Sequence, residues 1–248
     1  MSAFVLLADR RRDLPWALLL ASAASWALLA LWSDSELGRW LRHDYQPERA
    51  AAQLAAMTAY ALGWTLMTLA MMAPAAAALL AAFGRVTGAR ALRLAVVCGF
   101  LGVWLVTGCA FRALDGAVHA AVERSALLSS RPELVAAAGL LVAGAFQFAP
   151  AKRRCLTACR SPRGFVYRRW GRGAPRRDAL AIGASFGLSC VGCCWALMLV
   201  MFASSMSSFA LMAALTGVMA AERARRIGDR VVRPVGAALV AAAILLAA

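Results

Sequence analysis

The sequence lacks the motifs that mark most classes of enzyme. It contains no His-Glu-x-x-His zinc motif, no phosphate-binding loop, no dinucleotide fingerprint and no nucleophile elbow. The two histidines, His43 and His119, are not spaced as ligands to any residue near them in the chain. These absences leave thiol–disulfide exchange as the one enzyme class still open, and they favour a protein that is not an enzyme.

The long apolar segments lack amphipathic periodicity. Hydrophobic residues make up 62% of the 248 residues, whereas soluble domains average about half. They fall in blocks of about 17–25 residues, long enough to cross a bilayer core of about 30 Å. Because the blocks are apolar all round, a soluble bundle of amphipathic helices is excluded. The pattern predicts an all-α fold, a polytopic transmembrane helical bundle.

The chain has no internal repeat and no separate soluble domain, so residues 1–248 are predicted to form a single transmembrane domain. Charged residues, prolines and glycines divide it into about seven spans. A tight outer hairpin at Ser204-Ser205 is expected between the fifth and sixth spans. The spans are 15–33, 57–83, 93–113, 133–151, 178–203, 205–221 and 232–248.

Acidic residues are scarce: 12 Asp and Glu face 27 Lys and Arg, a net charge of +15. No nucleic-acid motif accompanies this charge, so nucleic acid is not expected as a partner. With the N-terminus inside, the cytoplasmic segments carry 21 basic residues and the outer loops carry 5. The positive-inside rule then predicts an N-in/C-out topology. The loop 152–177 is expected to be cytoplasmic and irregular, and to lie against anionic lipid.

Five of the seven cysteines lie in two clusters. Cys155 and Cys159 are four residues apart, which places both on one helical face at the cytoplasmic edge of the fourth span. Cys190, Cys193 and Cys194 form a stripe along the fifth span by their offsets of three and four. All seven cysteines lie within the spans or on the cytoplasmic side, which argues against a secreted disulfide framework.

Soft sulfur ligands favour Cu(I), with Zn(II) as the usual competitor for thiolates. Met198 continues the cysteine stripe one turn after Cys194. Met71 and Met72, just before Pro74 in the second span, could add thioethers that bind Cu(I) without carrying charge into the membrane. The alternative is that the cysteines and methionines simply pack in an apolar core.

Three further features carry structural expectations. Gly183 and Gly187, four residues apart, predict that another helix approaches the fifth span closely and that this span lies at the bundle centre. Gln147 is a lone polar group at membrane depth and needs a partner there. Arg112 and Asp115 are spaced for a local ion pair near the outer end of the third span.

Several motifs together resemble the bacterial family of predicted metal-binding integral membrane proteins, formally a domain of unknown function and sometimes labelled a copper chaperone. The resemblance runs from about residue 57 to 230. The family usually has glycine where this chain has Ser205, and lysine where it has Arg223. The motifs are Ala70-Met71-Met72-Ala73-Pro74, Phe146-Gln147-Phe148-Ala149-Pro150-Ala151-Lys152, Cys155-Leu156 with Cys159-Arg160-Ser161-Pro162, and Cys190-Val191-Gly192-Cys193-Cys194-Trp195-Ala196-Leu197-Met198.

The leading hypothesis is therefore a soft-metal, copper-handling protein of the bacterial inner membrane, with a metal donor or acceptor protein as partner. Cys155 and Cys159 would take metal at the cytoplasmic edge. The buried site would comprise Cys190, Cys193, Cys194, Met198, Met71 and Met72. The two sites are expected to lie too far apart to share one ion.

Two other functions stay open. One is a membrane thiol–disulfide oxidoreductase that uses the C-x-x-C spacing of Cys190 and Cys193. The other is a non-catalytic assembly or scaffold protein with packed cysteines. The sequence does not distinguish transport, storage and delivery of a metal.

Overall fold

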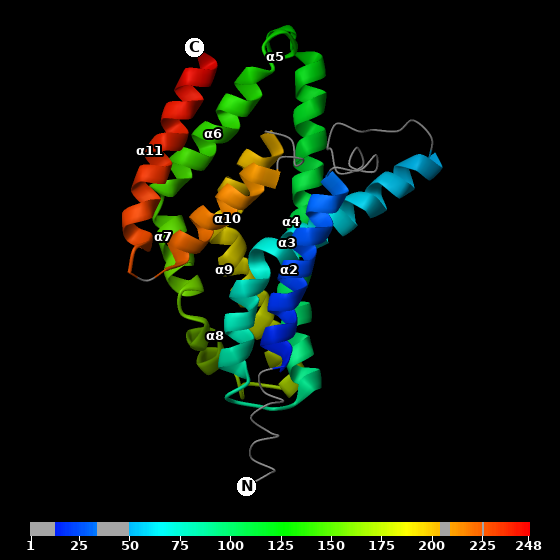
Figure 1. The fold of residues 1–248 in the computed structure, drawn as a ribbon, viewed down its shortest axis with the longest axis vertical. Helices are drawn as coiled ribbons and strands as arrows, with labels where there is room; N and C mark the ends of the chain where they lie inside the picture. Colours follow the sequence, from blue (N-terminus) through cyan, green and yellow to red (C-terminus); the bar gives the residue numbers. More distant parts are fainter. Residues whose placement is uncertain (1–12, 34–49, 204–208, 225) are drawn as a thin grey trace.

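The computed structural model describes residues 13–33, 50–203, 209–224 and 226–248 (Figure 1). Every regular element among them is a helix, so the all-α prediction is confirmed for the described chain. The helices are α2 (Asp13–Ser33), α3 (Ala50–Phe83), α4 (Arg90–Arg124), α5 (Ala126–Ser130), α6 (Glu133–Gln147), α7 (Pro150–Cys159), α8 (Pro162–Arg169), α9 (Pro175–Ala203), α10 (Phe209–Arg223) and α11 (Gly228–Ala247).

Five of the described helices are long and apolar enough to cross a membrane: α2, α3, α4, α9 and α11. The pair α6 and α7 makes a sixth candidate if it is counted as one span, although the two helices are bent by 69°. Helix α10, expected to be the sixth span, has only 15 residues in the described chain. By length and composition, the described residues thus contain five candidate spans, or six with the bent pair, where seven were expected. The expected hairpin at Ser204-Ser205 lies outside the described residues.

The helices form two groups around α9 (Figure 1). On one side, α3 packs against both α2 and α4. On the other side, α6 and α11 lie side by side, and a Cβ atom added at Gly144 of α6 would come within 2.7 Å of Val240 on α11. Figure 1 shows α8 and the α3–α4 connection at one end of the molecule, and α5 and the C-terminus at the other.

Helix α9 lies at the centre, as the glycine spacing predicted. It packs against α4, α6, α7, α8 and α10. A Cβ atom added at Gly183 would collide with the backbone carbonyl of Val96 on α4, and one at Gly187 would come within 3.1 Å of Val103. The close approach of α4 depends on these two glycines, because any larger residue would push the two backbones apart.

The chain turns sharply between α6 and α7. Helix α6 ends at Gln147, and Ala149 is extended with φ −67° and ψ 137°. Pro150 explains both features, because its ring disfavours a helical residue before it but suits the first position of the next helix. The span expected over 133–151 therefore ends early, and the chain continues as α7 at an angle of 69°.

The expectation of an irregular surface loop over 152–177 was wrong for most of its length. This segment contains the last eight residues of α7 and the whole of α8. Each of these helices begins at a proline. Lys152 is 1% exposed and lies inside the protein. Its charge is used in internal contacts and is not one of the surface charges of this segment.

Candidate metal centre

Helix α9 supplies three buried thiols. The offsets of three and four place Cys190, Cys193 and Cys194 on one face, and each is at most 2% exposed. The Cys193 and Cys194 thiols lie 3.1 and 2.9 Å from the backbone carbonyl of Cys190 and donate to it. This local back-bonding, which the helix geometry allows, gathers the three sulfurs within about one turn of α9.

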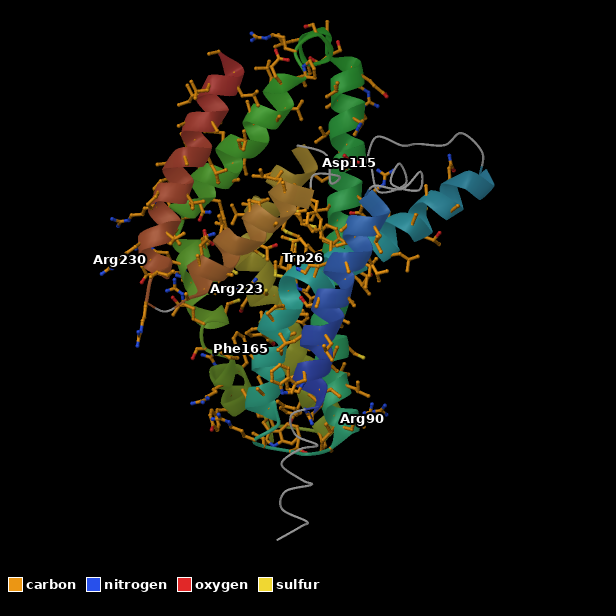
Figure 2. The ribbon with its side chains drawn as sticks, viewed as in Figure 1. Trp26, Arg90, Asp115, Phe165, Arg223 and Arg230 are labelled. Atoms are coloured by element: carbon orange, nitrogen blue, oxygen red, sulfur yellow. The ribbon has the colours of Figure 1, made fainter. Side chains whose placement is uncertain are left out.

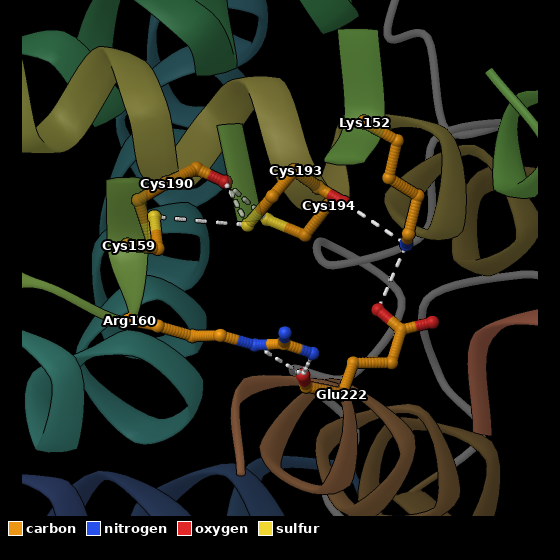
Figure 3. A network of polar contacts seen from close by, with 7 residues as sticks. All are labelled: Lys152, Cys159, Arg160, Cys190, Cys193, Cys194 and Glu222. Atoms are coloured by element: carbon orange, nitrogen blue, oxygen red, sulfur yellow. Dashed lines mark hydrogen bonds and ion pairs between the residues drawn. The ribbon is translucent and has the colours of Figure 1, made fainter. Parts of the chain in front are cut away.

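Helix α7 brings a fourth thiol to this face. The Sγ atom of Cys159 lies 3.8 Å from the Sγ atom of Cys193 (Figure 3). The expectation that the two cysteine motifs lie too far apart for one ion was therefore wrong. The bend before Pro150 is the reason, because it turns α7 against α9 instead of letting the chain leave the bundle.

Cys155 lies one turn before Cys159 on α7 and is half-buried. Its Sγ atom lies beside Gly192, where an added Cβ atom would come within 2.6 Å of it. The glycine inside the Cys-Val-Gly-Cys-Cys motif thus makes room for Cys155. Cys155 therefore lies at the interface between α7 and α9, against the backbone of Gly192.

Helix α3 contributes Met72, whose side chain is completely buried. Its Sδ atom lies 3.7 Å from Cys190 Sγ. Met71 and Met198 are also buried in the same apolar core. Among the predicted sulfur ligands, sulfur–sulfur contacts thus join Cys159 to Cys193 and Cys190 to Met72.

The donor set suits a soft metal in its chemistry and its spacing. Two sulfurs bound tetrahedrally to one ion at about 2.3 Å lie about 3.8 Å apart. The distances of 3.8 and 3.7 Å across the two helix interfaces match that separation. Among the described residues, however, no three His, Cys, Asp or Glu side chains already surround one metal position. The sulfurs form two pairs, one between α7 and α9 and one between α9 and α3. To bind one ion, the two pairs must move closer together.

A buried ion pair holds α7 against α10 beside this cluster. Lys152 Nζ lies 2.8 Å from the Glu222 carboxylate, and the two side chains are 1% and 2% exposed. Lys152 also donates to the backbone carbonyl of Cys193 at 3.1 Å (Figure 3). One cation therefore connects α7, α9 and α10 at the position of the thiols.

Arg160, which directly follows α7, makes a second connection to α10 and also one to α11. Its Nε and Nη2 atoms donate to the Glu222 carbonyl at 3.1 and 2.5 Å, and its Nη1 atom pairs with Asp229 at 2.8 Å. The guanidinium thus caps the C-terminal end of α10, where the last carbonyls have no hydrogen-bond partner within the helix.

Sequence reasoning missed the contribution of four charged residues to this region: Lys152, Arg160, Glu222 and Arg223. Lys152, Arg160 and Arg223 stand at positions of the family resemblance, but none of the four was given a role at the sulfur cluster. Their sequence signal was weak, since each stands at the edge of an apolar block where charges are common. Arg223 reaches the sulfurs directly, with Nη2 2.8 Å from Met72 Sδ.

The other polar expectations have mixed outcomes. Arg112 pairs with Asp115 at 3.2 Å, as predicted. His119 also approaches Asp115, with Nδ1 3.4 Å from a carboxylate oxygen, a contact that the sequence reasoning missed. Gln147 is buried, and neither side-chain amide atom has a hydrogen-bond partner in the described chain. His43 lies outside the described residues.

Comparison with known proteins gives one informative match. A family model described as a copper chaperone matches residues 61–246, which include every residue of the sulfur cluster. No curated protein and no solved structure is significantly similar to the chain. Because the family match covers most of the sequence, the chain belongs to the copper chaperone family.

Proposed function

We propose that this protein handles copper as Cu(I) in the bacterial inner membrane, binding the ion between α7, α9 and α3. The observation that carries the proposal is the 3.8 Å separation of Cys159 and Cys193 Sγ atoms from two different helices. Copper is the cargo of such a protein, received from one partner protein and passed to another.

The chemistry favours a soft monovalent ion at this place. Thiolates and thioethers are preferred ligands of Cu(I). The thiols lose their protons when the metal binds, so the metal charge replaces the proton charge in apolar surroundings. Met72 adds a neutral sulfur, which needs no compensating charge. A site of this composition holds the ion without leaving a large net charge inside the membrane.

The ligands fall into a central group and a flanking group. We assign Cys159, Cys190, Cys193, Cys194 and Met72 to the central group. Cys155 is the most exposed of the clustered thiols and lies one turn before Cys159, so it is the sulfur that a donor on that side would reach first. Met198 and Met71 flank the group within the core.

The topology proposed is N-in/C-out, with α8 on the cytoplasmic side. The placement of α8 and the α3–α4 connection at the end opposite α5 and the C-terminus supports it (Figure 1). Basic side chains of α8, namely Arg163, Arg168 and Arg169, would then face anionic lipid of the inner leaflet.

Metal content tests the proposal directly. The protein is purified from cells grown with copper or with zinc, and bound metal is measured by mass spectrometry. The expected result is near-stoichiometric copper in the wild type and its loss in Cys193→Ser/Cys194→Ser. The matched control is Cys98→Ser/Cys109→Ser, which removes two exposed thiols of α4 and keeps the copper. Substoichiometric metal in both growth conditions, unchanged by Cys193→Ser/Cys194→Ser, contradicts the proposal.

One observation also favours the second candidate, a membrane thiol–disulfide oxidoreductase. Cys159 and Cys193 are both free thiols, and their sulfurs already face each other. Maleimide trapping in cells, with and without reductant, separates the two functions. A disulfide that forms and is reduced again during growth favours the oxidoreductase, whereas thiols that stay reduced and bind copper favour the chaperone. A phenotype that survives serine at all five clustered cysteines would instead favour a scaffold.

A further inference from the structure

Arg223 is the last residue of α10, and its guanidinium reaches sulfur atoms on two other helices. Its Nη2 atom lies 2.8 Å from Met72 Sδ on α3 and 3.7 Å from Cys190 Sγ on α9. Both sulfur-bearing side chains are fully buried. Figure 2 shows Arg223 at the end of α10 near the middle of the molecule, away from both ends of the bundle.

No carboxylate balances this charge within the described chain. Glu222, the adjacent residue, pairs with Lys152 at 2.8 Å. The Arg223 Nε atom is buried and has no hydrogen-bond partner among the described residues. Met72 offers a neutral and weak acceptor. The guanidinium is only partly buried, but it lies against fully buried sulfurs, where an opposite charge nearby would stabilise it. The groups at this place that can carry such a charge are the cysteine sulfurs.

We propose that Arg223 is a fixed positive charge built into the sulfur cluster, and that it makes the cluster select a monovalent soft cation over a divalent one. The inference rests on the proposed function, since it concerns the ion held by the same sulfurs. A guanidinium keeps its proton under all physiological conditions, so this charge is permanent. The class of ion favoured is Cu(I) or Ag(I), and the class disfavoured is Zn(II) or Cd(II).

The reason is electrostatic. At one position, the repulsion from Arg223 acts twice as strongly on a divalent ion as on a monovalent ion. When two of the four central thiols lose their protons, two thiolates, one guanidinium and one monovalent ion sum to zero charge. The same ligands with a divalent ion leave a net positive charge in apolar surroundings, which is costly. The guanidinium therefore lowers divalent affinity relative to monovalent affinity.

The test measures the ratio of Cd(II) to Ag(I) affinity, since neither probe ion changes its oxidation state during the assay. Wild type, Arg223→Met and Arg223→Lys are compared in detergent by equilibrium dialysis with mass-spectrometric metal analysis. We expect the ratio to rise about tenfold or more in Arg223→Met. We expect it to change little in Arg223→Lys, which keeps the charge. Both ions are measured at one fixed pH, because thiol deprotonation contributes to the binding of each.

The matched control is Arg112→Met, which removes an arginine that pairs with Asp115 elsewhere. Its Cd(II)/Ag(I) ratio should equal that of the wild type. An unchanged ratio in Arg223→Met overturns the inference and leaves the proposed function standing. A wild type that binds neither ion through its cysteines overturns both.

Folding is monitored by size-exclusion chromatography. If Arg223→Met does not fold, Arg223→Gln takes its place, since it also removes the charge. A second measurement needs no variant: wild-type protein that takes up Cd(II) in the presence of equimolar Ag(I) overturns the inference.

Discussion

The Sγ atoms of Cys159 and Cys193 lie 3.8 Å apart although 34 residues separate them in the chain. Cys159 ends α7 and Cys193 lies within α9, so the contact joins two helices on either side of α8. Two thiols at this distance can share a soft metal, or they can be oxidised to a disulfide after a small movement. The pair is therefore the most informative place to perturb the protein.

Oxidation of the metal-free protein with diamide should join this pair. Diamide accepts two electrons and two protons, and the two thiols form one disulfide within the chain. We expect wild type to lose a pair of thiols in a maleimide gel-shift assay, and Cys159→Ser to keep them. Copper-loaded protein should be protected. The same loss of thiols in Cys159→Ser would show that another pair reacts and would contradict the observed proximity.

Removing one partner of the buried ion pair should destabilise the protein. Lys152→Met leaves Glu222 buried without its counter-charge, which costs about 3–5 kcal/mol in comparable pairs. We expect a clear fall in the thermal unfolding temperature in detergent. Lys152→Met/Glu222→Leu should fall less than Lys152→Met alone, because no unpaired charge remains.

The control for the ion pair is Arg131–Glu133, whose side chains are 46% and 36% exposed. Arg131→Met should shift the unfolding temperature little, because exposed pairs contribute about 0–1 kcal/mol. An unfolding temperature of Lys152→Met equal to that of Arg131→Met would argue against the buried pair.

Gly183→Ala should separate α9 from α4. An added Cβ atom collides with the Val96 carbonyl, so the helices must move apart, at a cost of about 1–3 kcal/mol. Gly102→Ala on α4 is the matched control, because nothing lies within 4 Å of its added Cβ atom. There alanine should be neutral or stabilising by up to about 1 kcal/mol. Equal unfolding temperatures for the two variants would mean that the helix contact is looser than described.

Reporter fusions test the proposed N-in/C-out topology. Alkaline phosphatase and a cytoplasm-only fluorescent protein are fused separately after Ala248 and inserted after Arg172. We expect an active phosphatase and a dark fluorescent protein after Ala248, and the opposite after Arg172, because the basic segments are retained inside. A bright fluorescent signal at both sites would mean that α11 does not cross the membrane.

Hydropathy and helical periodicity determined much of the secondary structure. The apolar blocks at 57–83, 93–113 and 178–203 lie within α3, α4 and α9, because a helix of that length and composition satisfies its own backbone. The stripe of Cys190, Cys193 and Cys194 follows from offsets of three and four alone. Gly183 and Gly187 predicted the central place of α9, because only small residues let two backbones approach so closely.

The composition of the sulfur cluster depended on packing between distant segments. The sequence contains Pro150, but proline alone does not say in which direction the chain turns or what it then meets. The 69° bend placed Cys159 against Cys193, and Lys152 in the interior. Met72 and Arg223 are 151 residues apart, so no local pattern could reveal their contact.

By itself, then, the sequence determined which segments are apolar helices and which side chains share a face of one helix, since both depend on residues within a few turns. The tertiary structure decided which side chains meet. Cys159 of α7 meets Cys193 of α9, and Met72 of α3 meets Cys190 of α9 and Arg223 of α10, because the bundle brings these distant segments together. The physical reason is that the direction of a turn and the crossing of two helices are set by steric fit and charge pairing across the whole bundle.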